Sequence, residues 1–497
     1  MGLVAAATFM LILDLTVVNV ALPEIQRSFH ARLTELEWMV NTYALFLAGL
    51  LLIAGSTADR LGRRLVFLVG MAIFTVGSLL SAVAPSAILL IVFRGFQGVG
   101  ASLLFATALG ILGSLFQGRE RVQALGVWGV AIGAGLAVGP LLGGLLTQLF
   151  GWPAIFIVNV PIGVAVVALS LWRMPESRDP HPRRIDGLGA ALLLGTLLTL
   201  IYALVQGNDS GWDSPEILGA FAAAIVLAGL FVLAERRPEP MADLGLLKDP
   251  RFRAAAIGVF GQGVVVGAML FYLVRFLQEG LGDSPLIAGL EILPMTVTAM
   301  GGALIGSRLA ARFRVEWMMC GALGLMSAGA LLMLLCTLSG GWLWLLPGML
   351  LAGLGWGAIN PASAHAALAS ADQEQTGMAS GFVNTARQVG IASGLGGLGA
   401  IFELEVRTHA FQRLSSLAPA ARTLVSVLAA RDGLGPAVQA AARPSRELVA
   451  HVVRAALLNG LDGVLIGAGL GALTAAVVIA LSGGRSRARS NTKRVAG

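Results

Sequence analysis

The chain has 497 residues, of which 57% are hydrophobic and 12% are charged, and its mean hydropathy is +0.83. About a quarter of the residues in a soluble domain are charged, so this composition excludes an ordinary soluble protein and predicts a polytopic membrane protein. The net charge of +7 does not indicate a nucleic-acid partner, because the Arg residues lie in short loops between apolar segments, where they set membrane orientation.

Fourteen apolar stretches of a length that can cross the hydrocarbon can be counted between polar breaks. The predicted fold is therefore an all-α membrane protein with fourteen transmembrane helices. In chain order the stretches lie roughly at 4–22, 38–58, 65–84, 87–113, 123–149, 154–172, 187–206, 215–234, 255–277, 286–307, 317–338, 342–367, 378–402 and 457–482.

Basic residues gather in alternate loops, at 59–64, 118–121, 173–184, 235–253 and 308–314. The short loops between them contain no Lys or Arg, except for Arg27 and Arg32 in the first. The positive-inside rule then places both termini in the cytoplasm of a multi-pass protein of the cell (inner or plasma) membrane. The first stretch begins at Met1 without a basic n-region or cleavage site, which predicts a spanning helix and not a cleaved signal peptide. The missing N-terminal cytoplasmic tail suggests a trimmed or misassigned start.

A short internal repeat relates the loops after the second and tenth helices. Asp59–Arg64 (DRLGRR) matches Ser307–Arg312 (SRLAAR) in register, with no acidic counterpart of Asp59. Two repeated six-helix bundles with a site between them are common in secondary transporters. The predicted organisation is a six-helix bundle at 1–172, a linker with two inserted helices at 173–254, a second six-helix bundle at 255–482 with a long outer loop at 403–455, and a basic cytoplasmic tail at 483–497.

Asp14 is a carboxylate in the middle of the first apolar stretch, where membrane insertion of an Asp costs roughly 2.5–3.5 kcal/mol. Arg94 in the fourth stretch shares one helix face with Gln97 and Gly98. We expect Arg94 to pair with Asp14; the alternative is an Arg that extends to the membrane surface. Thr16 and Asn19 lie on other faces of the first helix, so we expect them to bond a neighbouring helix and not to share the cavity of Asp14.

The segment from Gly55 to Arg64, GSTADRLGRR, is expected to form a tight turn that starts at glycine and carries one acid and three Arg. We expect these side chains to bind acids or a helix end in the other half, with the loop 369–377 and its Asp372 and Glu374 as one partner. The alternative is a simple topology anchor.

The fifth helix is rich in glycine, with Pro140 on the glycine face, where we expect a kink. The face is a packing surface on which two helices could slide or seal; the alternative is packing without a mechanistic role. Its glycines are Gly129, Gly133, Gly135, Gly139, Gly143 and Gly144.

The thirteenth helix carries a polar stripe of Ser380, Asn384, Arg387 and Gln388. Such stripes face other helices or a cavity and seldom face lipid. Asn384 and Arg387 are therefore candidates for a substrate path, together with Gln97 in the fourth helix and Glu291 in the tenth. Glu291, like Arg275 near the outer end of the ninth helix, is more readily placed at the membrane interface than on the path.

Several enzyme and nucleotide signatures are missing from the sequence. The G-x-G-x-x-G match at 394–399 lies inside an apolar helix, and neither Lys248 nor Lys493 stands in a P-loop frame. The histidines at 30, 181, 365, 409 and 451 are scattered, and Cys320 and Cys336 share one apolar stretch, so neither metal-ligand spacing nor a catalytic triad is present. We expect no cofactor, no metal, no nucleotide and no catalysis; a polytopic membrane enzyme is the remote alternative.

Taken together, these motifs resemble the major facilitator superfamily, in its fourteen-helix drug:proton antiporter branch (the EmrB/QacA type). The resemblance rests on LDLTVVNVALP (13–23), GSTADRLGRR (55–64), RGFQGVGA (94–101), GAGLAVGPLLGG (133–144), FIVNVPIG (156–163), GLEILPM (289–295) and ASGFVNTARQVG (379–390). The sequence departs from the family's usual GWRW at Pro153-Ala154, in an outer turn.

The resemblance implies a role for each matched position. Asp14 and Arg94 match the family's proton-coupling acid and its helix 4 arginine. The conformational gate would be Gly55, Asp59, Arg60, Gly62, Arg63 and Arg64, and the antiporter motif Gly135, Gly139, Pro140, Gly143 and Gly144.

The implied function is a proton-coupled multidrug or antibiotic exporter that works by alternating access. It would be driven by the proton gradient, with a small lipophilic substrate, protons and membrane lipid as partners, and we expect a monomer. An exporter of an endogenous metabolite or self-made antibiotic would use the same machinery, and a uniporter or symporter is disfavoured by the helix 5 pattern.

Overall fold

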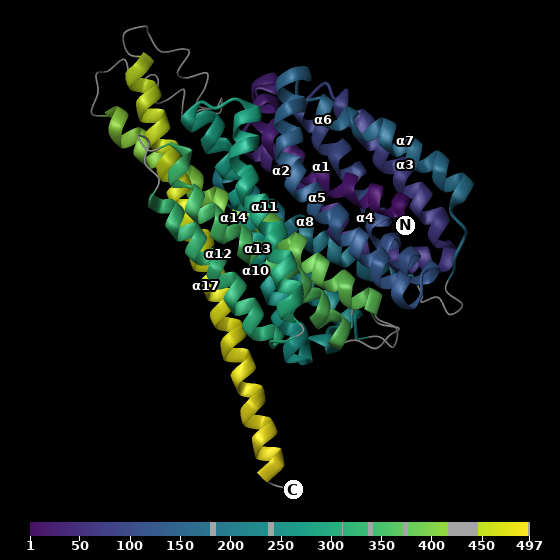
Figure 1. Cartoon of the computed structure of the whole chain (residues 1–497). Coiled ribbons are helices and arrows are strands. Elements are labelled where there is room, and N and C mark those ends of the chain that lie inside the picture. The colour runs from purple at the N-terminus through teal and green to yellow at the C-terminus, as the bar shows by residue number, and fades with distance from the viewer. Residues whose placement is uncertain are drawn as a thin grey trace.

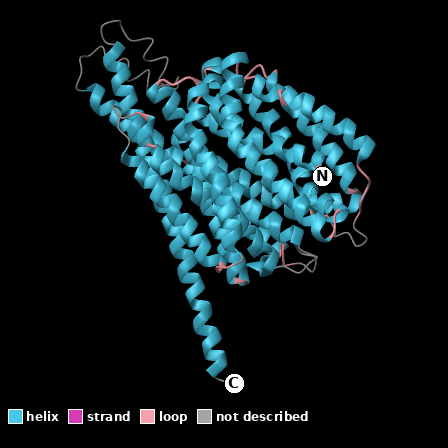
Figure 2. Ribbon diagram, viewed as in Figure 1, coloured by secondary structure: helices cyan, strands magenta, loops and turns pink. Residues whose placement is uncertain are grey.

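The computed structural model describes residues 1–178, 185–236, 243–310, 312–335, 341–370, 376–415 and 446–495. Within these ranges the regular structure is helical and contains no strand (Figure 2). The predicted all-α membrane fold is therefore confirmed.

The first half of the chain forms one group of packed helices. The sixth predicted helix is divided at Val158 into a short α6 and a longer α7. In the group, α1 packs on α5, while α2 and α3 both pack on α4. The helices are α1 (Gly2–Phe29), α2 (Leu33–Leu61), α3 (Arg63–Ala82), α4 (Ala87–Leu115), α5 (Gly118–Phe150), α6 (Ala154–Ile157) and α7 (Asn159–Arg173).

The second half forms a corresponding group. The helix α10 continues beyond Arg275 as a π-helical turn, η2 (Phe276–Leu281), and 3-10 turns flank the connection from α12 to α13: η3 (Met333–Leu335) and η4 (Trp342–Trp344). The helices are α10 (Pro250–Arg275), α11 (Pro285–Ala310), α12 (Val315–Leu332), α13 (Leu346–Ser370), α14 (Thr376–Ser415) and α17 (Arg446–Val495).

The helix contacts repeat between the two groups. The pairs α1–α5, α2–α4, α3–α4 and α3–α7 correspond to α10–α14, α11–α13, α12–α13 and α12–α17, and all eight are in contact. Two further pairs, α5–α11 and α2–α14, join the groups and exchange under the same correspondence. The packing therefore follows the internal repeat seen at Arg60–Arg64 and Arg308–Arg312.

Two helices lie between the groups in the sequence, α8 (Gly187–Ser210) and α9 (Pro215–Ala234). They pack against each other, and α8 also contacts α2 and α14. A short 3-10 turn, η1 (Leu244–Lys248), precedes α10. Large apolar side chains on α9, such as Leu218, Ile225 and Leu233, are more than half exposed, as expected for a helix surrounded by lipid.

Thirteen helical segments of the described chain are long and apolar enough to cross a membrane. The remaining predicted stretch, 342–367, is formed largely by α13, which has 25 residues and carries Asn360, Ser363 and His365 among its apolar residues. Length therefore allows α13 to span as well.

The expected outer loop at 403–455 is shorter than predicted, because α14 continues to Ser415 and α17 already begins at Arg446. Residues 416–445, the rest of that loop, lie outside the described residues. The helix α17 also runs on to Val495, through most of the predicted tail, and extends well beyond the bundle (Figure 1).

Candidate functional site

Asp14 and Arg94 form a buried ion pair between α1 and α4. Their side chains are 0% and 1% exposed, and Nη1 of Arg94 donates to Oδ2 of Asp14. The expected partner of Arg94 is therefore present, and the alternative of an Arg that extends to the membrane surface is wrong for this structure. A buried pair of opposite charges avoids the cost of one isolated charge, although removing either partner exposes that cost in full.

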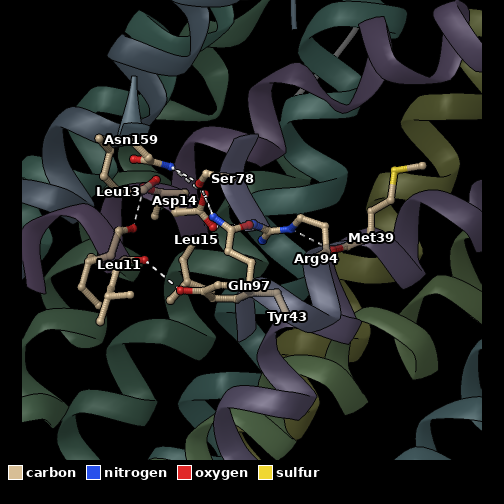
Figure 3. Close-up of polar contacts among 12 residues, drawn as sticks. Leu11, Leu13, Asp14, Leu15, Met39, Tyr43, Ser78, Arg94, Gln97 and Asn159 are labelled. Carbon is tan, nitrogen blue, oxygen red and sulfur yellow. Dashed lines mark hydrogen bonds and ion pairs between the residues drawn. The ribbon is translucent and has the colours of Figure 1, made fainter. Parts of the chain in front are cut away.

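Three polar side chains complete this charge cluster, which we define as Asp14, Arg94, Gln97, Asn159 and Ser78 (Figure 3). Gln97 Nε2 and Asn159 Nδ2 both donate to Oδ1 of Asp14, at 2.9 and 3.1 Å. The same two amides donate to Ser78 Oγ at 2.7 and 3.2 Å, and Gln97 Oε1 accepts from Arg94 Nη1 at 2.7 Å. The carboxylate of Asp14 therefore accepts hydrogen bonds from one guanidinium and two amides.

The guanidinium of Arg94 is also held on its other sides. Its Nε donates to the carbonyl oxygen of Met39 at 3.3 Å, and its Cζ lies 4.3 Å from the ring centroid of Tyr43. A cation over an aromatic face in a desolvated site is stabilised by the ring. The arginine is therefore fixed by α2 as well as by α1 and α4.

A cavity of about 1650 Å³ lies between the two groups of helices. Its walls come from α1, α2, α4 and α5 on one side and from α10, α11, α13 and α14 on the other. On α1 the lining residues are Leu11, Ile12, Leu15, Thr16 and Asn19, and Asp14 is not among them. The charge cluster therefore lies behind the cavity wall.

Thr16 and Asn19 do lie apart from Asp14, as the helical wheel predicts. Thr16 Oγ1 donates to Gly135 O of α5 at 3.3 Å, which bears out the expected bond to a neighbouring helix. Asn19 Nδ2 instead donates to Leu15 O of its own helix at 3.0 Å. Thr16 and Asn19 share no cavity with Asp14, as expected, but it is these two residues and not Asp14 that face the cavity.

The cavity extends to one end of the bundle, which we call the basic end because α2 and α3 meet there at Arg63 and Arg64. Asp59, Ser114 and Ser307 line the cavity at this end. Gly133 of α5 and Met300 of α11 line the cavity as well.

At the opposite end the two groups are in contact. A Cβ built on Gly289 of α11 would overlap Pro140 O of α5, and one built on Gly144 would overlap Pro285 O. Tyr272 of α10 donates to Oε1 of Glu37 on α2 at 2.5 Å. The cavity is therefore closed at this end.

The gate segment differs from the expected turn. The helix α2 continues through Gly55 to Leu61, and the turn is at Gly62, whose φ of 116° favours glycine. A Cβ at Gly62 would also stand 2.7 Å from the carboxylate of Glu176. Gly55 instead lines the cavity with no atom near its missing side chain, so the prediction of a turn starting at Gly55 was wrong.

The described partners of the gate segment lie in its own half of the chain. Arg63 donates to Oδ1 of Asp59 at 2.8 Å and to Gly110 O at 3.3 Å, while Arg60 is exposed. The backbone N of Arg64 donates to Glu176 Oε1 at 3.0 Å, and its Nη2 donates to Leu171 O at 2.5 Å. The expected partners in the other half are not seen, and Asp372 and Glu374 lie outside the described residues.

The glycines of α5 pack against two neighbouring helices, α1 and α11. Gly135, Gly139 and Gly143 face α1, whereas Gly144 faces the start of α11. Gly129 and Gly133 line the cavity, and α5 continues as a helix through Pro140. The predicted packing face is present, and its outer end contributes to the seal between the two groups.

We expect Gly143→Ala to lower the unfolding temperature, because its Cβ would meet Val17 O of α1 at 2.7 Å. Overpacking of this kind costs about 1–3 kcal/mol. Gly129→Ala is the matched control, since nothing lies within 4 Å of its Cβ, and there alanine should stabilise the helix by about 0.5–1 kcal/mol. Thermal unfolding of both variants in one detergent measures the difference; equal effects would contradict close α1–α5 packing at Gly143.

Only some of the candidate substrate-path residues line the cavity. Asn384, Arg387 and Gln388 line the cavity from α14, whereas the side chain of Ser380 lies outside the described set. Gln97 belongs to the charge cluster and does not line the cavity.

Glu291 and Arg275 also lie away from the cavity wall. Glu291 is 5% exposed, and its Oε2 has no hydrogen-bond partner. Arg275 pairs with Glu279 at 3.0 Å near the closed end. Gln97 and Glu291 therefore do not line the cavity in this conformation, and their place on a substrate path stays a prediction.

Sequence reasoning missed four residues of the site: Ser78, Asn159, Glu37 and Tyr272. Asn159 stands in FIVNVPIG, where a single amide in an apolar helix could have indicated a buried partner. Ser78 and Tyr272 give no such signal, because Ser and Tyr occur on many faces of membrane helices.

Comparison with known proteins identifies the family to which the chain belongs. The sequence matches the Major Facilitator Superfamily over residues 4–395, and the chain belongs to this family of membrane transporters. Two solved structures of a bacterial homolog of the human lysosomal transporter Spinster share the fold. They cover 97% of this chain and 95–97% of their own, with TM-scores of 0.63 and 0.65 at 17% and 16% identity.

Among curated relatives, the multidrug efflux pump LfrA of Mycolicibacterium smegmatis is 33% identical over 97% of this chain and 95% of its own. The methylenomycin A resistance protein of Bacillus subtilis is 35% identical over 82% of this chain and 88% of its own. The multidrug resistance protein Stp of Mycobacterium tuberculosis is 35% identical over 79% of this chain and 73% of its own. These relatives are transport and resistance proteins, and the members of this family are transporters and not enzymes.

Proposed function

We propose that the protein is a proton-coupled exporter of small lipophilic compounds that works by alternating access. The observation that carries the proposal is the buried Asp14–Arg94 pair, which lies behind the wall of a large cavity in a transporter fold. An intramembrane charge pair of this kind is a functional feature by default, because charges are costly in lipid.

The basic end of the bundle faces the cytoplasm in this proposal, since loops rich in Arg stay inside. Both chain ends are then cytoplasmic, in the inner or plasma membrane. The cavity reaches the basic end and is closed at the other, so the structure corresponds to an inward-facing state. Outward opening requires α5 and α11 to separate at Gly144 and Gly289 while the basic end closes.

Asp14 is the proposed proton carrier and Arg94 its regulator. Three donors are directed at the carboxylate of Asp14 in this state. Loading a proton would neutralise Asp14 and leave Arg94 without its counter-charge, so protonation and movement of α4 relative to α1 would favour each other. One proton moving down about 150 mV supplies about 3.5 kcal/mol. That sustains a gradient of a few hundred-fold in a neutral substrate.

The other matched motifs take the gating roles. The segment with Gly55, Asp59, Arg60, Gly62, Arg63 and Arg64 would close the basic end, and Gly135, Gly139, Pro140, Gly143 and Gly144 would form the face along which α5 moves. We propose that the protein acts as a monomer in lipid and uses the proton gradient without cofactor or nucleotide.

Export of a self-made antibiotic or other endogenous compound is the second candidate. It is favoured by relatives that include the tetracenomycin C resistance and export protein of Streptomyces glaucescens, 32% identical over 96% of this chain, and a probable actinorhodin transporter of Streptomyces coelicolor. The mechanism would be the same.

The test uses everted membrane vesicles with an acidified lumen and a panel of cationic, neutral and anionic dyes and antibiotics. We expect substrate-triggered proton release for the unchanged protein and none for Asp14→Asn, because an amide side chain cannot bind and release a proton as a carboxylate does. Asp209→Asn is the matched control: Asp209 is also paired with an arginine, Arg32, but it is 24% exposed near a helix end. Release that survives Asp14→Asn would refute proton coupling through Asp14.

A further inference from the structure

Arg387 differs in position from the other charged residues that line the cavity. Asp59, Arg63, Glu235 and Asp243 line it near the basic end, where α2, α9 and the linker before α10 terminate. Arg387 lies well inside α14, one turn from Ile391, whose backbone packs against Gly263 and Gly267 of α10. In the described part of the deep cavity wall, the formal charge is therefore positive.

The guanidinium of Arg387 has unused hydrogen-bonding capacity. Nη1 donates to Asn384 Oδ1 at 3.4 Å, and Nε is buried without a hydrogen-bond partner. No ion pair with Arg387 is found among the described residues. A guanidinium offers five N–H donors in a fixed fork that matches a carboxylate or similar anion, so most of this fork remains available.

The membrane-embedded carboxylates are not positioned to neutralise it. Asp14 is engaged by Arg94 behind the cavity wall, and Glu37 accepts from Tyr272 at the closed end. Glu291 and Asp462 are absent from the cavity lining. Arg387 is half-buried, and a charge that is partly withdrawn from water without a counter-charge is unfavourable. An anion that enters the cavity would supply that counter-charge.

The surroundings of Arg387 suit an apolar anion with further polar groups. Gln388 and Asn384 flank it on α14, and on α10 Gln262 lines the same cavity with its Oε1 unpartnered, while Gln262 Nε2 is held by Trp356 O at 2.9 Å. Across the cavity, the walls from α1, α4 and α5 include Leu11, Leu15, Phe105 and Trp128. Ligand sites typically combine such apolar walls with a few polar groups that fix orientation.

We propose that Arg387 is the anchor of the substrate site and that the preferred substrates are apolar organic anions, such as aromatic carboxylates. The inference rests on the proposed export function, and it names the substrate class for that site. The anionic group would bind the free N–H groups of Arg387, with Asn384 and Gln388 beside it and the apolar part of the molecule against the α1, α4 and α5 wall.

Equilibrium binding to the purified full-length protein in nanodiscs tests the proposal. The probes are radiolabelled 2-naphthoate and two competitors of nearly the same size, its neutral methyl ester and the cation 2-naphthylmethylammonium. A charge-assisted hydrogen-bonded contact contributes about 1.5–3 kcal/mol, so we expect naphthoate to bind about 10- to 100-fold more tightly than the ester or the amine. Arg387→Gln should remove that preference, and Arg387→Lys should keep part of it.

Arg407→Gln is the control, because Arg407 stands on the same helix with its side chain 54% exposed and outside the cavity. It should bind naphthoate as the unchanged protein does. Equal binding of the three probes, no binding of naphthoate, or an unchanged preference in folded Arg387→Gln would each overturn the proposal.

The vesicle experiment separates this inference from the proposed function. Proton release by neutral or cationic compounds, combined with no naphthoate preference, would refute the anion site and leave the exporter intact. Naphthoate binding through Arg387 without proton release by any compound would support the site and refute the proton-coupled exporter.

Discussion

Replacing Arg94 with Met should destabilise the folded protein by about 3–5 kcal/mol, because it leaves the carboxylate of Asp14 buried without its cation. The side chain of Asp14 is 0% exposed, and the amides of Gln97 and Asn159 cannot replace a full positive charge. Thermal unfolding of the variant and of the unchanged protein in nanodiscs measures this loss of stability.

The double variant Asp14→Asn/Arg94→Met should recover most of that loss, because a neutral pair of similar volume carries no uncompensated charge. Arg407→Met, which removes a largely exposed arginine, should change stability by less than about 1 kcal/mol. A double variant that is as unstable as the sum of its single variants would show that the two residues do not interact.

Gly289→Phe should hold the protein in a state that is open at the end opposite the basic end. In the structure, Gly289 lies against Pro140 O so closely that even a Cβ would overlap it. Forcing extra atoms into such a contact costs about 1–3 kcal/mol, which shifts the populations of the two states by about 5- to 100-fold. Transport should fall accordingly while the protein remains folded.

Spin labels report the shift directly. With Cys320 and Cys336 replaced by Ser, labels at Val83 and Trp344 mark the two groups at the closed end; these side chains are 65% and 53% exposed. The distance between the labels should increase in Gly289→Phe and stay unchanged in Gly301→Phe, a position on the same helix with nothing within 4 Å of its Cβ. An unchanged distance in folded Gly289→Phe would contradict the proposed seal.

The sequence predicted the parts of the molecule that lipid constrains most strongly. Segment length predicted the helices, and the cost of isolated charges predicted that Asp14 and Arg94 would meet. The repeat of Arg60–Arg64 at Arg308–Arg312 correctly indicated matched packing in the two groups of helices. Each of these predictions depends on a penalty that a membrane imposes regardless of the details of packing.

The orientation of each helix could not be predicted in the same way. Apolar residues surround most of these helices, so periodicity does not identify the face toward the cavity. Gln97 was therefore expected on a substrate path although it binds Asp14 behind the cavity wall, and the exposure of Thr16 to the cavity was not predicted. Asn159 and Ser78 were not connected with Asp14. Likewise, the proposed mechanism requires the contacts of Arg63 and Arg64 to differ between the two states, and a sequence does not specify a conformational state.

The separation of Asp14 and Arg94 from the cavity wall has a consequence for how such a transporter can diversify. Substitutions at lining positions such as Leu15, Phe105 or Trp356 change the shape and polarity offered to a compound without changing the residues that bind Asp14, the proposed proton carrier. Related transporters can therefore acquire new substrates through changes in the cavity lining while the charge cluster stays unchanged. The same division makes the lining residues the natural positions for a mutational library aimed at altered cargo.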